Sequence, residues 1–302
     1  MPSPFTIEQV VEKVPDWKGK SLSISPLSGG LTNINYRVDV DGTPFVVRIP
    51  GDNTELLAID RTNEYHNTRA AAEAGVGPCI VHCLPEANVM VLEFIHGETM
   101  SRVKLQRAGM PTRMAQAIKQ LHAGPRFLLD FNMFRLTELY LRIVQEHEVR
   151  IPTGYRDYLP QVAQIEAALA RRPLASVPCH NDLLAENYLD DGQTLRLIDF
   201  EYSGNNDPTF ELGNTCQEQQ FDDARIEEMC AAYFGEAAPD KLARMRLNMI
   251  VSDVGWTLWA AIQASISKIE FDYWGWAVER CDRAAAKLNS SHFNELLRTV
   301  EP

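Results

Sequence analysis

The segment from residue 180 to residue 218 constrains this chain more than any other. It opens with His-Asn-Asp-Leu-Leu-Ala-Glu-Asn, and an apolar run separates this motif from Ile-Asp-Phe-Glu-Tyr. The polar residues are flanked by apolar ones, as at the ends of short buried strands. The spacing predicts a loop followed by a hairpin, with Asp182, Asn187 and Asp199 near one rim.

These three side chains carry the groups that phosphoryl transfer from a nucleotide requires. Asp182 can orient a substrate hydroxyl and accept its proton. Asn187 and Asp199 offer oxygens of the kind that magnesium prefers, and magnesium neutralises nucleotide phosphates. The alternative for Asp182, a simple turn cap, fits the segment less well. For Glu201, a contact at the metal and a solvated surface position are equally good interpretations.

The two motifs resemble the catalytic and metal-binding loops of kinase-like phosphotransferases. Protein kinases carry His-Arg-Asp and Asp-Phe-Gly there, whereas this chain has His-Asn-Asp and Asp-Phe-Glu. The difference favours the branch of aminoglycoside phosphotransferases and choline kinases, which act on small molecules. The continuation resembles the choline/ethanolamine kinase signature at fixed offsets. The matching residues are Ile198, Asp199, Phe200, Glu201, Tyr202, Asn206, Phe210, Gly213, Asn214 and Glu218.

The composition fits a globular protein and limits its partners. The 302 residues are 45% hydrophobic and 23% charged, enough for one large domain or two lobes. A net charge of −12 argues against a nucleic-acid partner. Six cysteines without a Cys-x-x-Cys pair favour reduced thiols over a metal site. We expect no membrane span and no signal peptide, hence a cytoplasmic protein, and the sequence leaves open whether it forms a homodimer.

Periodicity divides the chain near residue 95. The first part is expected to contain a helix, three strands, a helix and two strands, at 6–14, 21–27, 33–40, 44–49, 59–74, 80–82 and 89–93. After a hinge at 94–97, helices are expected at 112–122, 135–149, 158–171, 208–219, 223–234, 239–269 and 274–288. The resemblance implies an α+β, two-lobe, protein-kinase-like fold. Its small antiparallel-sheet lobe (1–95) would bind nucleotide, and its larger, mainly helical lobe (96–302) would carry catalysis and substrate binding.

Several residues of the first lobe are candidates for binding ATP. Arg48 stands in an otherwise apolar strand, where kinases place a lysine that holds phosphates and pairs with a helix glutamate, here Glu64. An outward-facing strand residue is the alternative. By resemblance, a turn would offer backbone N–H groups to phosphates and the hinge would bind adenine. The turn residues are Ser28, Gly29, Gly30, Thr32 and Asn33, and the hinge residues are Glu93, Phe94 and Ile95.

Aromatic residues near the C-terminus are candidates for binding the acceptor. Four of the five tryptophans lie between residues 256 and 276. A trimethylammonium group cannot donate hydrogen bonds, so proteins hold it with aromatic faces and a nearby carboxylate. Core packing is the alternative, and we favour it for Tyr273 and Trp274. By resemblance, the pocket for choline is lined by Glu218, Trp256, Trp259, Phe271 and Trp276.

Together these patterns predict an ATP- and magnesium-dependent kinase that converts choline to phosphocholine. An ethanolamine kinase and an aminoglycoside-type phosphotransferase are alternatives with the same fold. An inactive sensor of nucleotide or choline is disfavoured, because the three residues of the catalytic rim are all present. His180 is expected to brace the catalytic loop, and His122 to bind the C-terminus of its helix.

Overall fold

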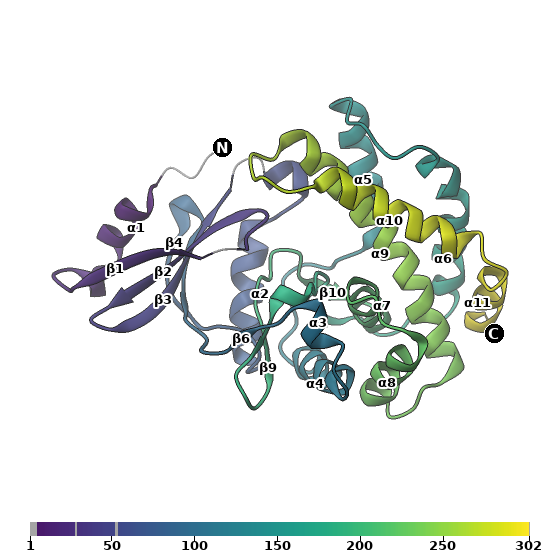
Figure 1. Ribbon diagram of the computed structural model, residues 1–302, viewed down its shortest axis with the longest axis horizontal. Helices are drawn as coiled ribbons and strands as arrows, with labels where there is room; N and C mark the ends of the chain where they lie inside the picture. The colour runs from purple at the N-terminus through teal and green to yellow at the C-terminus, as the bar shows by residue number, and fades with distance from the viewer. Residues whose placement is uncertain (1–4, 28, 52–53, 302) are drawn as a thin grey trace.

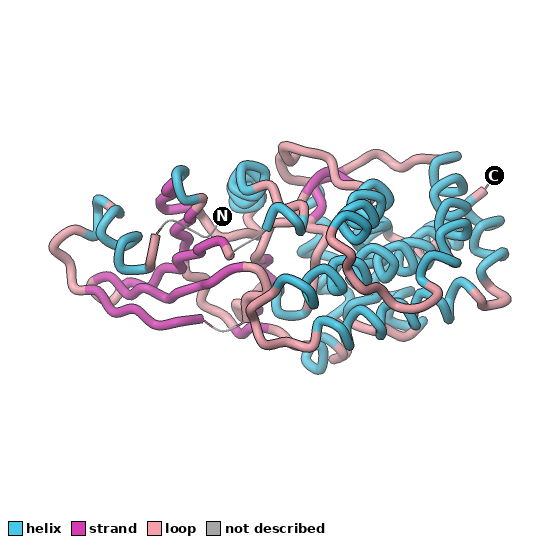
Figure 2. The backbone as a smooth tube through the Cα atoms, turned by 90° about the horizontal axis from the view of Figure 1, so that it is seen from above, coloured by secondary structure: helices cyan, strands magenta, loops and turns pink. Residues whose placement is uncertain are grey.

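The computed structural model describes residues 5–27, 29–51 and 54–301, and Ser28 lies outside the described residues. A small lobe that contains a sheet lies beside a larger helical lobe (Figure 1). Seen from above, strands gather at one end of the molecule and helices at the other (Figure 2). The predicted α+β, two-lobe architecture is confirmed.

The small lobe is built on a five-stranded antiparallel sheet with the order β1-β2-β3-β5-β4. Asp41 and Gly42 connect β2 to β3 with φ values of 48° and 85°, the left-handed backbone that a tight hairpin turn requires. Helix α1 (Ile7–Lys13) buries Val10 against one face of the sheet. The strands are β1 (Leu22–Leu27), β2 (Asn33–Val40), β3 (Thr43–Pro50), β4 (Ile80–Leu84) and β5 (Val89–Glu93).

Helix α2 (Arg61–Glu73) and the short turn before it, η2 (Thr54–Leu57), join the two lobes. Leu57 is 2% exposed and packs in the core of the large lobe. Its carbonyl accepts hydrogen bonds from the hydroxyls of Tyr140 at 2.8 Å and Tyr202 at 3.1 Å. Packing of the large lobe therefore includes a segment that precedes the hinge.

The large lobe is organised around α9 (Pro239–Ile266), which packs against α5, α7, α10 and α11. Helices α4 to α10 follow the predicted periodicity, whereas α3 and α11 are too short to have been predicted. None of the helices in the described parts of the chain has the length and apolar character needed to cross a membrane. The other helices are α3 (Arg102–Leu105), α4 (Met110–His122), α5 (Met133–Glu146), α6 (Leu159–Arg171), α7 (Pro208–Glu218), α8 (Asp223–Phe234), α10 (Tyr273–Leu288) and α11 (Phe293–Val300).

The predicted loop and hairpin lie between α6 and α7. Strand β8 pairs with β9 as a hairpin, while β7 pairs with β10. The Ile198 N–H donates to the Asn187 carbonyl at 3.1 Å, so the second motif returns to the first. The short elements of this region are β6 (Glu98–Thr99), β7 (Val177–Cys179), η5 (Ala185–Asn187), β8 (Tyr188–Asp190), β9 (Leu195–Leu197) and β10 (Gly204–Asn206).

Two expectations about ring side chains were wrong. The ring of His122 does not bind its own helix terminus. It faces the lobe interior, because α4 packs on β7, and it lies 2.7 Å from the Tyr233 hydroxyl. Trp274 is half-buried under the guanidinium of Arg150, at 3.9 Å from the ring centroid. Tyr273, one position earlier on α10, faces α9 and is buried in the core as predicted. All six cysteines are free thiols; four are buried and Cys83 is half-buried, whereas Cys79 is exposed.

We expect Leu57→Ala to lower the free energy of unfolding by about 2–5 kcal/mol, because it opens a cavity inside the large lobe. Urea unfolding followed by circular dichroism measures this change. Leu22→Ala, at a position that is 37% exposed on β1, is the control and should cost far less. Equal losses in the two variants would show that the segment before α2 is not part of that core.

Candidate active site

Two adjoining pockets occupy the cleft between the lobes. The hinge pocket, of about 430 Å³, is lined by Arg48, Glu64 and hinge residues 93–95. The aromatic pocket, of about 310 Å³, is lined by Asp182 and by the predicted aromatic residues. Their common wall consists of Gly29, Glu186, Asn187 and Asp199. Among the described turn residues, Gly30 and Asn33 line neither pocket, and Thr32 lines the aromatic one.

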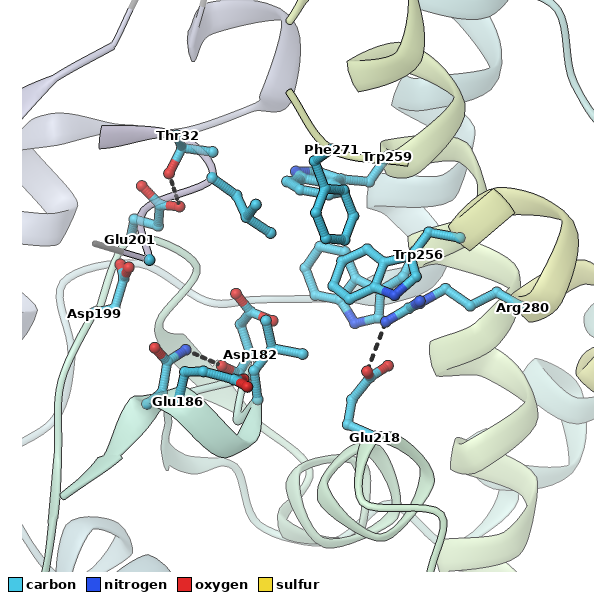
Figure 3. A pocket seen from close by; sticks show the side chains of 15 residues that line it. Thr32, Asp182, Glu186, Asp199, Glu201, Glu218, Trp256, Trp259, Phe271 and Arg280 are labelled. Atoms are coloured by element: carbon cyan, nitrogen blue, oxygen red, sulfur yellow. Dashed lines mark hydrogen bonds and ion pairs between the residues drawn. The ribbon is translucent and has the colours of Figure 1, made fainter. Parts of the chain in front are cut away.

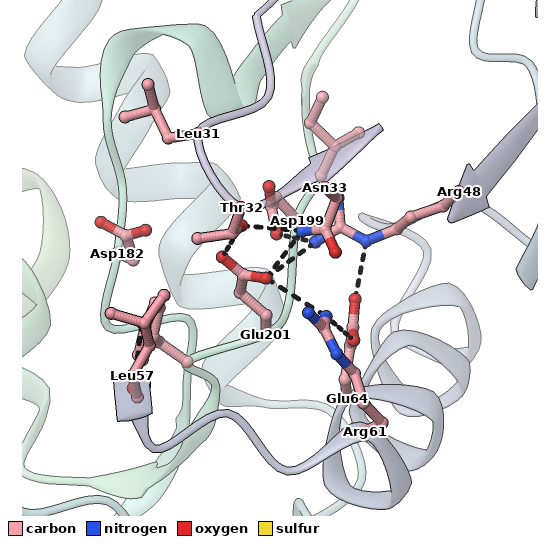
Figure 4. A network of polar contacts seen from close by, with 12 residues as sticks. Leu31, Thr32, Asn33, Arg48, Leu57, Arg61, Glu64, Asp182, Asp199 and Glu201 are labelled. Carbon is pink, nitrogen blue, oxygen red and sulfur yellow. Dashed lines mark hydrogen bonds and ion pairs between the residues drawn. The ribbon is translucent and has the colours of Figure 1, made fainter. Parts of the chain in front are cut away.

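Arg48 is buried beside the hinge pocket and paired with Glu64, as predicted. Its Nε lies 2.7 Å from Glu64 Oε1, and a terminal nitrogen contacts the carboxylate of Asp199 (Figure 4). Burial alone would lower the pKa of Arg48, but Asp199, Glu64 and Glu201 raise it above its ordinary value. Arg48 therefore remains a fixed cation at the pocket wall, and the outward-facing alternative is wrong.

Glu201 is buried at the junction of the lobes, so its solvated alternative is wrong. Its carboxylate accepts from the Thr32 hydroxyl at 2.6 Å, from the Asn33 amide at 2.8 Å, and from Arg48 and Arg61 at 3.3 Å each. Burial and a neighbouring carboxylate raise the pKa of Glu201 to about 7, although the two arginines lower it. The side chains of Thr32 and Asn33 thus bind this carboxylate and draw their turn onto the large lobe.

Hydrogen bonds to the backbone hold the loop that carries Asp182. Asn181 has φ 66°, a left-handed conformation that asparagine adopts more readily than most residues. Its side-chain amide donates to three backbone carbonyls nearby. The backbone N–H groups of His180 and Asn181 both donate to the buried carboxylate of Glu211. The residue before the candidate base is therefore fixed from several sides.

His180 braces this loop as predicted. Its Nε2 lies 2.8 Å from the Ile198 carbonyl, and the Asp182 N–H donates to its Nδ1 at 3.3 Å. Because a carbonyl can only accept, Nε2 carries the proton and Nδ1 is the acceptor. Burial lowers the pKa of His180, which agrees with a neutral ring.

Asp182 faces the aromatic pocket (Figure 3). Burial, followed by the charges of Asp199, Glu201 and Glu218, raises the pKa of Asp182 well above its ordinary value. A carboxylate with a raised pKa is a stronger base. Cations that enter the cleft would lower the pKa again and restore the ionised form.

The residues around Asn187 and Asp199 fit a magnesium ion. The Asn187 amide donates to the Asp182 carbonyl at 2.8 Å, which leaves its oxygen as the atom that can bind a cation. Carboxylate oxygens of Glu64, Asp199 and Glu201 lie within 4.8 Å of one another. When all three carboxylates are ionised, their charge exceeds that of Arg48 and Arg61 by one negative unit, and oxygen donors with excess negative charge suit Mg²⁺.

The predicted aromatic residues form one wall of the aromatic pocket (Figure 3). The rings of Trp256 and Trp259 meet edge to face with centroids 6.5 Å apart. Trp276 lies 6.3 Å from Trp259 and 5.0 Å from Phe271. Trp256 and Trp259 are also core residues, with 5% and 6% exposed. These two side chains therefore pack in the core and also line the pocket.

Glu218 lines the aromatic pocket with a carboxylate that is paired at one oxygen, while its buried Oε1 accepts no hydrogen bond from the described residues. Its Oε2 lies 2.6 Å from Arg280 Nη2, and Arg283 follows at 3.9 Å. The Arg280 guanidinium also stacks on Trp276 at 3.9 Å from the ring centroid. Attraction of a cation to this pocket would therefore depend on the aromatic faces and on Asp182 more than on Glu218.

Sequence reasoning missed four residues that line the aromatic pocket: Leu31, Leu184, Glu186 and Arg280. Arg280 lies four residues after Trp276, on the same face of α10, and this spacing could have identified it. Glu186 precedes Asn187 in the first motif and borders both pockets. Leu31 could not be identified from its neighbours in sequence, because its position depends on a distant helix. Gln263 of α9 donates a hydrogen bond to its carbonyl at 3.2 Å.

Comparisons with known proteins agree with this geometry. A family model described as "Phosphotransferase enzyme family" matches residues 23–247. The structure of a choline/ethanolamine kinase family protein from Mesorhizobium loti is 36% identical, with a TM-score of 0.85 and 96% of each chain covered. Choline kinase LicA from Streptococcus pneumoniae is 26% identical, with a TM-score of 0.79 and coverage of 93% of this chain and 98% of its own. Ethanolamine kinase 1 from Mus musculus is 28% identical over 88% of this chain and 84% of its own.

We expect Arg280→Met to lower the free energy of unfolding by about 3–5 kcal/mol, because it leaves Glu218 as a poorly compensated buried charge. Denaturant titration measures this loss. Adding Glu218→Gln to the same variant should recover part of it. The control is Arg126→Met, at an exposed pair with Asp130, which should cost at most about 1 kcal/mol. A loss no larger than that of the control would contradict a buried ion pair.

Proposed function

The chain belongs to the choline/ethanolamine kinase family of phosphotransferases, whose acceptor is an alcohol group, and we propose that it is a choline kinase. It would transfer the γ-phosphate of ATP to the choline hydroxyl and release ADP and phosphocholine. Residues 1–95 would supply most of the nucleotide site and residues 96–302 the catalytic and acceptor sites.

The observation that carries the choice of acceptor is the aromatic pocket with its paired carboxylate. A primary ammonium donates three hydrogen bonds and needs free acceptors, whereas a trimethylammonium donates none and binds aromatic faces. Here four aromatic rings line the pocket, whereas Glu218 offers only its Oε1, because its Oε2 is already bonded to Arg280. An aminoglycoside, with several ammonium groups, would require more unpaired carboxylates than this wall offers. These contacts support choline over the alternatives.

In the proposed reaction, Asp182 accepts a hydrogen bond from the choline hydroxyl and takes its proton as the oxygen attacks the γ-phosphorus. His180 and Glu211 hold the loop, so that the carboxylate needs no rearrangement. The bond between the γ-phosphorus and the β,γ-bridging oxygen breaks, and ADP leaves.

Arg48 would bind the phosphates, and residues 93–95 would bind adenine through backbone groups. Gly29, at the common wall, would approach the phosphates closely through its backbone. Asn187 and Asp199, with Glu201 beside them, would hold magnesium. When bound, this ion neutralises the charge that develops on the leaving phosphate.

We expect ADP release to be fastest with choline, followed by dimethylethanolamine, ethanolamine and kanamycin, and to stop with excess EDTA until magnesium is restored. Asp182→Asn should lower kcat by about 100- to 10,000-fold, because it removes the base. A coupled assay of ADP release measures both effects. The control is Asp191→Asn, on the exposed hairpin turn, which should retain activity. Preference for ethanolamine or kanamycin would refute the proposed acceptor, and full activity of Asp182→Asn would refute the proposed base.

We expect Phe271→Leu to raise the KM for choline about two- to fivefold, because it removes one aromatic face worth about 0.5–1 kcal/mol at a partly exposed site. Steady-state kinetics with choline and ethanolamine measure the change, which should be smaller for ethanolamine. Phe271→Tyr keeps the ring and should stay near wild type. Equal changes in the leucine and tyrosine variants would mean that the ring face does not bind the ammonium.

A further inference from the structure

Asn214 lies between the base loop and the aromatic pocket, although it lines neither. It is on α7, four residues before Glu218, and its side chain is fully buried. Its amide Nδ2 donates to the Asn181 carbonyl at 3.2 Å. Its Oδ1 accepts from the Ser252 hydroxyl at 2.6 Å and from the Trp256 indole Nε1 at 3.1 Å. One side chain thus contacts the residue before the candidate base and a wall of the candidate acceptor pocket.

Chemistry fixes the orientation of this amide. An indole N–H can only donate, so the atom that faces Trp256 must be the amide oxygen. A backbone carbonyl can only accept, so the atom that faces Asn181 must be the amide nitrogen. A flipped Asn214 would set donor against donor and acceptor against acceptor. The side chain therefore has one satisfied arrangement, and that arrangement ties the loop and the pocket together.

The position of the base is sensitive to this bond. Asn181 is in the left-handed conformation, so the direction of its carbonyl sets how the chain enters Asp182. Glu211 fixes the N–H of Asn181, and Asn214 fixes the carbonyl of the same residue. A misplacement of about 1 Å in such a site can cost about 100-fold in rate.

We propose that Asn214 is a positioning residue that fixes the position of Asp182 relative to Trp256, so that a bound acceptor presents its hydroxyl to the base. The inference rests on the proposed choline kinase function. It adds a residue that touches neither substrate nor nucleotide and acts on both the binding and the rate of the acceptor.

Three substitutions separate the two contacts of Asn214, which are the hydrogen bond to the Asn181 carbonyl and the hydrogen bond from the Trp256 indole. Asn214→Ala removes both contacts. Asn214→Asp keeps an oxygen for Trp256 and Ser252, but it loses the donor to Asn181. Trp256→Phe removes the indole N–H together with the fused five-membered ring, and it keeps a smaller aromatic face in the pocket.

Steady-state kinetics with choline and ATP give the readout. Asn214→Ala should raise the KM for choline about 2- to 12-fold, as expected for one lost hydrogen bond, and lower kcat about 10- to 100-fold, with the KM for ATP within about twofold. Asn214→Asp should lower kcat and leave the KM for choline near wild type. Trp256→Phe should raise the KM for choline. Combined with Asn214→Ala, it should raise KM by less than the product of the single effects, because both act through one contact.

Asn248→Ala is the matched control. Asn248 is a buried asparagine of α9 whose amide donates to Thr209 at 3.0 Å, away from both pockets. It should lower stability and leave kcat and the KM for choline unchanged. If Asn214→Ala does not fold, Ser252→Ala carries the same test, because it removes one donor that fixes the Asn214 amide. It should shift both constants in the same directions by smaller factors.

Three results would overturn this inference and leave the proposed function intact. The Asn214 variants could show wild-type kinetics. Asn248→Ala could lower kcat as much as Asn214→Ala at an equal loss of stability, or the effects in the double variant could multiply. Unchanged kinetics of Ser252→Ala, used in place of a variant that does not fold, would overturn it as well. No ADP release by the wild-type protein with any acceptor of the panel would overturn the proposed function and this inference with it.

Discussion

The active-site arrangement depends on the buried carboxylate of Glu201. This residue belongs to the large lobe, yet the side chains that donate to it come from the small lobe: Thr32, Asn33, Arg48 and Arg61. A charge removed from water needs such partners, because its lost hydration is not compensated otherwise. One group therefore fixes the spacing of the lobes, the turn before β2 and the arginine at the hinge pocket. Together with Glu64 and Asp199, it forms a cluster of three carboxylates that favours a cation at the place where the two pockets meet.

The catalytic loop has a backbone that few residue types tolerate, and its sequence reflects this. Asn181 and Asp199 have φ values of 66° and 72°, a region that costs most residues about 1–2 kcal/mol. For Asn181, the two N–H groups of the side-chain amide are shared among three carbonyls, and hydrogen bonds worth about 0.5–1.5 kcal/mol each offset that cost. Side chains that act in the site are thus presented by a backbone held in a single conformation. In the sequence His-Asn-Asp, the central Asn181 fixes the backbone conformation, and Asp182 carries the carboxylate proposed as the base.

Local patterns were enough to predict the hairpin at Asp41-Gly42, the main helices and the three polar residues of the rim, because each depends on neighbours in sequence. Family resemblance added the pair of Arg48 with Glu64. The burial of Glu201 could not be predicted, since its partners lie between 140 and 169 residues away. The ion pair of Arg280 with Glu218 could not be predicted for the same reason, because the two residues are 62 positions apart. Helix α11 was not predicted, because a segment of eight residues shows too little hydrophobic periodicity.

The presence of Arg280 in the pocket proposed to bind a cation has a physical explanation. Arg280 compensates the buried carboxylate of Glu218 through a contact of 2.6 Å, and Arg283 adds a second positive charge at 3.9 Å. The pair also cancels most of the charge that could attract an ammonium. Choline and ethanolamine each carry one positive charge, so charge could not discriminate between them in any case. Methyl groups packed against the rings can, since each buried carbon is worth about 0.8 kcal/mol. Selectivity in this pocket would therefore follow from shape and aromatic contact, with charge setting only the general preference for cations.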